Sequence, residues 1–170
     1  YTLANGGVIG ATAFFLSVDN RIDYVFGTPA RYENVVGKSE TKGVELSATL
    51  PLSDRISVGA NYTYTDARRP DGTRQSRVAR HDFGLTMDAE ITDRLRGSLS
   101  LQHVADRPDD GFPAVAMDDY TVVNANFRYE ITESLEANFR IENLFDEQYQ
   151  QVAGYGTSDR AFYVGISSRF

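Results

Sequence analysis

The sequence predicts an all-β fold, an antiparallel up-and-down transmembrane β-barrel segment of about eight strands. Three observations support this prediction. Apolar and polar residues alternate with a period of two through most of the chain, short and long connections between these segments follow one another in strict order, and no segment shows a sustained helical period. We expect short periplasmic turns at one end of the strands and long extracellular loops at the other.

The composition narrows the class of protein. The 170 residues carry a net charge of −7, which argues against a nucleic-acid partner because phosphate binding needs clustered Lys and Arg. The chain has no cysteine, so neither a disulfide nor a thiolate metal site is available. No apolar run reaches the roughly 20 residues of a transmembrane helix, whereas alternating membrane strands are compatible with this composition.

Four strands are predicted in the first half of the chain, at 8–26, 43–50, 55–65 and 83–89. The alternation is clearest in 55–65, where Ser, Gly, Asn and Thr occupy the positions between the apolar residues. We expect each strand to have one apolar side. The apolar sets are Val8, Phe14, Leu16, Val18, Ile22, Tyr24 and Phe26; Val44, Leu46, Ala48 and Leu50; Ile56, Val58, Ala60, Tyr62 and Tyr64; and Phe83, Leu85, Met87 and Ala89.

Four more strands are predicted at 94–103, 121–129, 134–142 and 160–170. Their polar sides must contact water, because they carry Arg94, Arg96, Glu136, Arg140 and Glu142. The apolar sets are Leu95, Leu99 and Leu101; Thr121, Val123, Ala125, Phe127 and Tyr129; Leu135, Ala137, Phe139 and Ile141; and Phe162, Val164, Ile166 and Phe170.

The connections between strands are of two kinds. The stretches "LSDRI", "ITDRL" and "ITESL" recur about 40 residues apart and place Ser or Thr, then an acidic residue, between two strands. Such side chains hydrogen-bond their own backbone, which suits a tight turn between antiparallel strands. The other connections, at 27–42, 66–79, 105–119 and 146–159, are longer and hold most of the Gly, Pro and Asp.

A meander with one apolar side could be a soluble barrel with that side inside, or a membrane barrel with that side outside. Predicted strands of about 10 to 13 residues suit a tilted crossing of a bilayer better than an ordinary globular sheet. Aromatic residues also fall near the strand ends, with Tyr62 and Tyr64 at one end and Tyr129 and Phe170 at the other, as in the girdles of membrane barrels. These features favour the membrane barrel.

We find no catalytic or metal-binding pattern. His81 and His103 lie in different predicted strands without a carboxylate at ligand spacing, so strand or girdle positions explain them better than a metal site. The acidic stretches at 68–73 and 107–113 lack the ligand series of a calcium loop and suit turns. With no nucleophile elbow, phosphate-binding loop or triad spacing, we expect a protein that is not an enzyme and has no cofactor.

The stretch "RIENLFDEQYQQVAGYGTSDRAFYVGISSRF" resembles the last two strands of a TonB-dependent outer-membrane receptor. The family pattern is matched by Asn143, Leu144, Phe145, Asp146, Tyr149, Gly154, Tyr155, Arg160 and Phe170. Upstream, "NVVGKSETKGVELSATLPLSDRISVGANYTYTDA" resembles the recurrent strand pattern of the same family, so the resemblance covers most of the chain. "GYGTSDR" and "QHVADRPDDGF" are similar to segments of vitamin B12 receptors.

This resemblance implies that residues 1–170 are the C-terminal part of a larger barrel, whose plug and earlier strands are absent. It implies a receptor in the outer membrane of Gram-negative bacteria that binds a scarce metal chelate, a corrinoid or a ferric siderophore, and imports it with energy from the TonB complex acting through the plug. Arg94, Arg96, Arg140 and Glu142 are then expected to line the lumen and pack against the plug.

The resemblance also implies residue roles. The ligand-contact candidates are Tyr149, Tyr155 and Arg160. The apolar set that ends the chain, Phe162, Val164, Ile166 and Phe170, resembles the signal that the barrel assembly machinery recognises, and it is expected to face outer-membrane lipid. The alternative is a self-contained eight-stranded barrel, either a small outer-membrane protein or a soluble lipocalin-like ligand binder.

Overall fold

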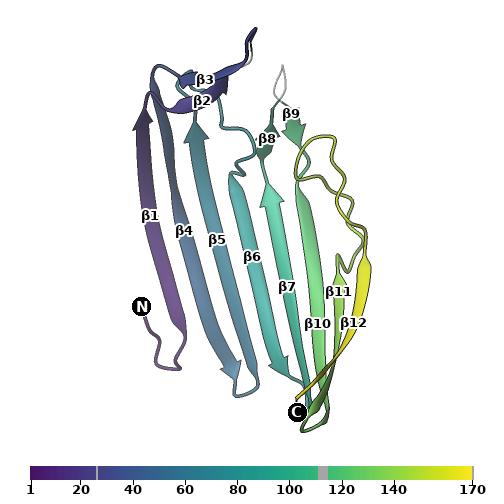
Figure 1. Cartoon of the computed structure of the whole chain (residues 1–170). Helices are drawn as coiled ribbons and strands as arrows, with labels where there is room; N and C mark the ends of the chain where they lie inside the picture. The colour runs from purple at the N-terminus through teal and green to yellow at the C-terminus, as the bar shows by residue number, and fades with distance from the viewer. Residues whose placement is uncertain (26, 111–114, 170) are drawn as a thin grey trace.

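The structure, a computed structural model, describes residues 1–25, 27–110 and 115–169. Eight strands form one antiparallel sheet in the order β1-β4-β5-β6-β7-β10-β11-β12 (Figure 1). Their bounds are β1 (Val8–Asp19), β4 (Lys38–Ser53), β5 (Ile56–Arg68), β6 (His81–Glu90), β7 (Leu95–Ala105), β10 (Tyr120–Thr132), β11 (Leu135–Glu142) and β12 (Ala161–Ser168). The predicted antiparallel meander is confirmed.

The described residues contain no helix long and apolar enough to span a membrane.

The three tight turns form as predicted, with a hydroxyl accepting a backbone hydrogen bond in each. Between β4 and β5 the Arg55 N–H donates to the Ser53 hydroxyl at 3.3 Å, and between β10 and β11 the Ser134 N–H donates to the Thr132 hydroxyl at 3.4 Å. Between β6 and β7 the Thr92 hydroxyl accepts from the Leu95 N–H at 3.0 Å. These bonds satisfy backbone groups that the reversal of the chain removes from the sheet.

The long connections gather at the opposite end of the sheet (Figure 1). Two of them contain short hairpins, β2 (Ile22–Val25) with β3 (Arg31–Asn34), and β8 (Arg107–Asp109) with β9 (Val115–Met117). The single strand predicted at 8–26 is therefore two strands, and β2 belongs to a separate sheet. Asn20 between them has a φ of +50°, a left-handed conformation that breaks the extended run and that Asn adopts more readily than most residues.

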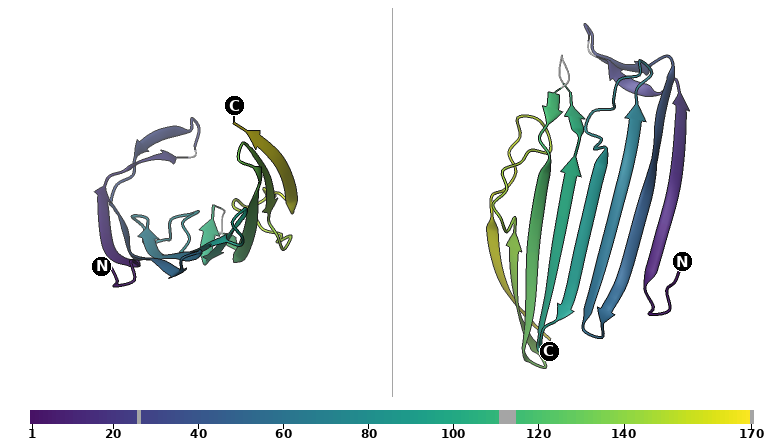
Figure 2. Two further views of the ribbon diagram at one scale, coloured as in Figure 1. Left: turned by 90° about the horizontal axis from the view of Figure 1, so that it is seen from below. Right: turned by 180° about the vertical axis from the view of Figure 1, so that it is seen from behind.

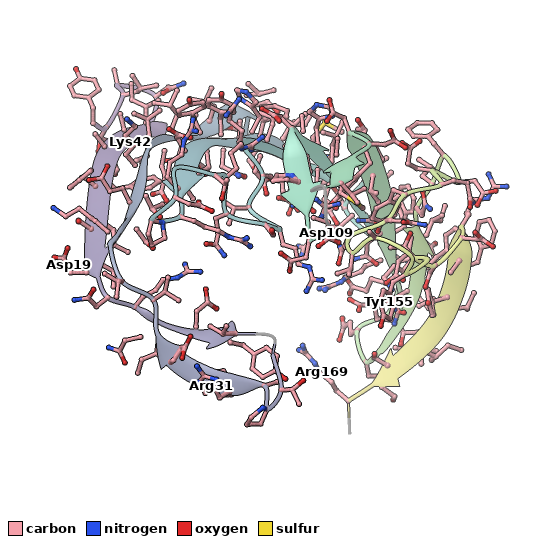
Figure 3. All side chains as sticks on the ribbon, turned by 90° about the horizontal axis from the view of Figure 1, so that it is seen from above. Asp19, Arg31, Lys42, Asp109, Tyr155 and Arg169 are labelled. Carbon is pink, nitrogen blue, oxygen red and sulfur yellow. The ribbon has the colours of Figure 1, made fainter. Side chains whose placement is uncertain are left out.

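The cross-strand register places most polar side chains of the seven strands from β4 to β12 in this sheet on one face. One row of partners, for example, joins Thr86 to Ser100 and Ser100 to Asn124. The sheet curves into an open arc, and its polar face is the concave one, where Asp109 and Arg169 also point (Figures 2 and 3). A hollow of about 850 Å³ on this side is lined mainly by polar and charged residues. The apolar face is convex, the arrangement of a membrane barrel and the reverse of a soluble lipocalin-like barrel.

The predicted apolar side of β1 is wrong. Phe14 pairs with Gly43, and Gly43 with Thr65, so the predicted set that includes Phe14 and Leu16 lies on the concave face. The convex face of β1 carries Ile9 and Phe15 among others. Both alternating sets of this strand are apolar, so its own pattern could not select a face.

Glycines on the sheet make room for aromatic rings from the neighbouring strand. A Cβ at Gly43 would lie 2.5 Å from the Phe14 ring and 2.0 Å from the Tyr64 carbonyl oxygen. A Cβ at Gly97 would lie 3.2 Å from the Phe127 ring on the convex face. The rings cover backbone that a glycine leaves bare, a recurrent device in β-sheets.

The eight strands do not close on themselves, because β1 and β12 lie at opposite edges of the sheet (Figure 2). The closure required by a self-contained eight-stranded barrel is therefore not observed in the described part of the chain. On β12 the convex face carries Phe162, Val164 and Ile166, which are 60%, 78% and 70% exposed. Phe170, the last member of the predicted assembly signal, lies outside the described residues.

We expect Leu99→Arg and Ile141→Arg on the convex face to reduce insertion of the full-length receptor into outer membranes. An arginine near the middle of the lipid-facing surface costs about 2–4 kcal/mol. Ser98→Arg is the matched control, because Ser98 precedes Leu99 on the same strand and faces the concave side. Quantifying the receptor in outer-membrane fractions tests the assignment, and greater damage from Ser98→Arg than from Leu99→Arg would show that the faces are reversed.

Candidate functional site

Three long segments fold together at the outer end of the sheet, on its concave side (Figures 1 and 3). We call them the outer loop cluster: residues 69–80 between β5 and β6, residues 106–110 around β8, and residues 143–160 between β11 and β12. They come from distant parts of the sequence, and ionised side chains and backbone groups connect them. The cluster lies above a concave wall of charged and polar side chains.

Asp106 connects the first two segments. Its carboxylate accepts from Arg74 Nη1 at 2.5 Å and from Arg80 Nη1 at 2.7 Å, and its carbonyl oxygen accepts from Arg74 Nη2 at 2.6 Å. Desolvation tends to raise the pKa of Asp106, but these two arginines outweigh it and the pKa is lowered. The segment 69–80 is therefore attached to the start of β8 by charge-assisted hydrogen bonds.

Asp109 connects all three segments, and its side chain is only 1% exposed. The carboxylate accepts from the Ala153 N–H at 2.5 Å, from Arg77 Nε at 2.7 Å and from the Asp110 N–H at 2.6 Å. These three donors, the Ala153 N–H first, lower the pKa of Asp109 to about 2. A buried carboxylate with this set of donors is ionised at neutral pH, and its hydrogen bonds hold the three segments against one another.

Arg107 reinforces the contact between β8 and the last segment. Its Nη2 donates to the Gln150 carbonyl oxygen at 2.5 Å, and its guanidinium lies 5.6 Å from the centre of the Tyr120 ring. Tyr120 is buried and packs against Tyr149, with ring centres 4.4 Å apart. Arg107 and Asp109 thus hold the chain on both sides of residues 151–152.

Asn143 shapes the start of the last segment. It is 4% exposed, has a φ of +51°, and its amide side chain donates to the carbonyl oxygens of Glu147 and Ser158 while accepting from the Glu147 N–H. Asp146 accepts from the Arg160 N–H at 2.8 Å, which joins the two ends of the segment. The "NLFD" stretch is therefore a structural element that returns the chain to β12.

The three predicted ligand-contact residues lie in different surroundings. Tyr155 is 72% exposed and follows Gly154 in a turn closed by the Tyr155 N–H and the Val152 carbonyl. Tyr149 packs on Tyr120 at the base of the cluster. Arg160 donates to the Leu144 carbonyl at 3.4 Å and lies over the Phe162 ring, toward the convex face. Ligand contact by these residues stays a prediction, and the geometry favours Tyr155, since the other two brace the loop.

Charged pairs line the concave wall below the cluster. Arg96 forms an ion pair with Glu90 at 3.3 Å, and Arg140 forms one with Glu142 at 3.4 Å. The Arg140 guanidinium also lies 4.3 Å from the centre of the Tyr163 ring. Arg96, Arg140 and Glu142 are among the residues that the sequence predicted for the polar face, and Arg94 lies in the turn before β7.

Both histidines lie on the convex face and hydrogen-bond to hydroxyl groups. His81 Nδ1 lies 2.8 Å from the Tyr62 hydroxyl, and the ring stands 5.5 Å from Tyr64, while His103 Nδ1 lies 2.8 Å from the Thr121 hydroxyl. These contacts place the two side chains in a band of aromatic and polar residues near the outer strand ends, as the sequence predicted.

Sequence reasoning missed Asp109. The stretch at 107–113 was interpreted as a turn, and the part that the structure describes forms β8, whose Asp109 bonds residues 44 positions away along the chain. No local pattern signals such a contact. Asn143 carried a signal, because it belongs to the stretch that resembles the family, but its role was not predicted.

We expect Asp109→Asn to loosen the outer loop cluster, because an uncharged amide forms a weaker bond to Arg77 and to the Ala153 N–H. Hydrogen-exchange protection of the Ala153 amide should fall, while insertion of the barrel into the membrane is unchanged. The folded pKa lies below the ordinary value of 3.8, so the contribution of Asp109 is complete above about pH 4 and is lost as the pH falls toward about 2. Equal protection in the variant and the parent protein would contradict this role.

Comparisons with known proteins agree with this architecture. Residues 1–144 match the family model described as TonB dependent receptor-like, beta-barrel. The vitamin B12 transporter of Vibrio cholerae is 30% identical over 178 residues, covering 100% of this chain and 28% of its own length. An iron-regulated outer membrane virulence protein of Vibrio cholerae is 23% identical over 195 residues, covering 100% of this chain and 29% of its own.

Solved structures share the fold. A mutant of the ferric enterobactin receptor of Pseudomonas aeruginosa superposes with a TM-score of 0.82 at 21% identity, covering 100% of this chain and 30% of its own. The ferripyoverdine receptor of the Pseudomonas aeruginosa outer membrane gives a TM-score of 0.81 at 19% identity, covering 98% of this chain and 25% of its own. The chain thus spans less than a third of the length of these relatives. It belongs to the TonB-dependent receptor-like β-barrel family, in the outer membrane of Gram-negative bacteria.

Proposed function

We propose that residues 1–170 form the C-terminal part of the barrel wall of an active-transport receptor, which binds a scarce metal chelate and imports it with energy from the TonB complex. The observation that carries this proposal is the joined set of outer loops above a polar concave wall, with an apolar convex face toward lipid. Such an arrangement presents a binding surface to the cell exterior, with a hydrated, polar lumen beneath that surface.

The open edges of the sheet support the assignment to a larger barrel. Apart from an isolated bridge between Thr2 and Val8, the outer sides of β1 and β12 lack strand partners among the described residues. Unpaired backbone groups are costly in hydrocarbon. Further strands of the same protein would satisfy both edges, and relatives more than three times as long as this chain have the residues to supply them.

A corrinoid or a ferric siderophore is the ligand class we propose. The relative that is 30% identical is named as a vitamin B12 transporter, and the neighbours that share the fold are named as ferric siderophore receptors. Tyr155, which is 72% exposed on the outer loop cluster, is the candidate contact residue that we favour.

The same proposal assigns partners to the two faces. Arg94, Arg96, Arg140 and Glu142 would pack against a plug, through which the TonB complex acts. The exposed Phe162, Val164 and Ile166 on β12 would contact the barrel assembly machinery during insertion and outer-membrane lipid afterwards.

The transport proposal predicts uptake by the full-length receptor in a Gram-negative host that lacks its own receptors for these ligands. We expect accumulation of radiolabelled cyanocobalamin or of one member of a ferric siderophore panel, and we expect it to stop when TonB is deleted. The host without the receptor is the control. Uptake that persists without TonB, or binding of none of these chelates, would contradict the proposal.

The assignment to a larger barrel predicts that residues 1–170 alone, reconstituted in detergent, will not form a compact monomer whose gel migration changes on heating. Closed membrane barrels show this heat-dependent change because the sheet has no free edge. The full-length receptor is the positive control. A compact, heat-modifiable monomer of the 170-residue chain would instead support a self-contained eight-stranded barrel.

A further inference from the structure

Arg77 has an unusual backbone conformation within the outer loop cluster. Its φ is +62°, in the left-handed region that long side chains seldom adopt, and such a conformation persists where the surroundings enforce it. Two contacts do so: the Arg77 N–H donates to the Pro108 carbonyl at 2.7 Å, and Arg77 Nε donates to the Asp109 carboxylate at 2.7 Å. Both the backbone and the side chain of Arg77 are thus held by β8.

The hydrogen-bonding of Arg77 differs from that of the other arginines in the segment 69–80. Arg69, Arg74 and Arg80 use their terminal nitrogens to bind Asp110, Ser76 or Asp106, and their side chains are only 35%, 23% and 28% exposed. Arg77 is held through Nε. Its Nη1 and Nη2 donate no hydrogen bond to a residue that the structure describes. Nη2 forms an ion pair with Asp110 Oδ2 at 4.0 Å, and the side chain is 52% exposed.

Asp109 also binds the turn that carries a second exposed side chain. The Ala153 N–H that it binds belongs to the turn that presents Tyr155, and Tyr155 is exposed. Asp109 thus binds Arg77 Nε at 2.7 Å and, at the same time, the N–H of Ala153, two residues before Tyr155. Hydrogen bonding to Asp109 is also the main cause that raises the pKa of Arg77. One buried carboxylate therefore orients donors from two loops.

We propose that Arg77, together with Tyr155 on the turn that Asp109 also binds, binds an anionic group, a carboxylate or a phosphate, carried by the imported chelate. This inference rests on the proposed function and names the chemistry of its ligand. The two terminal nitrogens lie in one plane and donate no hydrogen bond to a described residue, so they match the two oxygens of such a group. A guanidinium that is already oriented also loses little conformational freedom on binding. Asp109 and Asp110 offset the charges of Arg77 and Arg69, so recognition depends on directed hydrogen bonds at short range.

The test uses the purified full-length receptor and calorimetric titration with paired probes. Cyanocobalamin, which has a phosphodiester, is paired with cobinamide, which lacks it, and ferric citrate is paired with the uncharged ferrichrome. Arg77→Asn is the main variant, because Asn tolerates a φ of +62° and removes the guanidinium with little change in backbone strain. Arg31→Gln is the control, since Arg31 is 59% exposed on the β2–β3 hairpin at the same end of the sheet.

We expect Arg77→Asn to weaken binding of the anionic probe by about 10- to 100-fold, with binding of the matched uncharged probe nearly unchanged. Arg77→Lys should remain weakened, because a single ammonium cannot both bond Asp109 and present two nitrogens. Tyr155→Phe should show a smaller loss for the anionic probe. Arg31→Gln should bind as the parent protein does.

A purely structural role for Arg77 would weaken the anionic and uncharged probes alike, and that result would overturn the inference. The inference would also be overturned if Arg77→Asn bound the anionic probe as tightly as the parent protein does. The same conclusion would follow if the parent receptor bound only the uncharged probes. Absence of binding to every probe by the parent receptor would contradict the proposed function itself, so the two failures can be distinguished.

Discussion

The antiparallel hydrogen-bond ladder is the constraint on which the rest of the structure depends. Hydrocarbon offers no water to backbone N–H and C=O groups, so each must be bonded within the protein. The register that runs without a break from Val8↔Thr49 to Asp19↔Lys38 meets this need, and because the side-chain period is two it also fixes which face each residue occupies. One constraint therefore produces both the paired backbone and the separation of an apolar convex face from a polar concave face.

Beyond the ends of the ladder, side chains take over the task of bonding backbone groups. Asp109 accepts from the Ala153 N–H, Asn143 bonds backbone groups of Glu147 and Ser158, and Arg74 donates to the Asp106 carbonyl oxygen. These contacts link loops that are distant in sequence into one outer surface. The loops are thereby held together by polar contacts, and the terminal nitrogens of Arg77 donate no hydrogen bond to a residue that the structure describes.

The order of neighbouring residues was enough to predict the strands and turns. The alternation in β5 and the hydroxyl-bearing residue in each tight turn both depend only on residues that are close in sequence. The local sequence could not assign the face of β1, since Ile9 and Phe15 alternate with equally apolar Phe14 and Leu16, and only the pairing of Phe14 with Gly43 decides. The local sequence could not predict the role of Asp109 either, because the donors to its carboxylate come from positions 77, 110 and 153. Tyr155 was identified by resemblance alone, and its place on a turn that Asp109 binds follows from tertiary structure.

The most direct test of this account is the accessibility of neighbouring residues on β7. Ser100 faces the concave side and Leu101 the convex side, and the chain contains no native cysteine. In a full-length receptor whose only cysteine is introduced by Ser100→Cys or Leu101→Cys, we expect a membrane-impermeant thiol reagent to label the first variant in permeabilised cells. We expect the second to be labelled only by a lipid-soluble reagent. The opposite pattern would contradict the assignment of an apolar face to lipid and a polar face to the lumen.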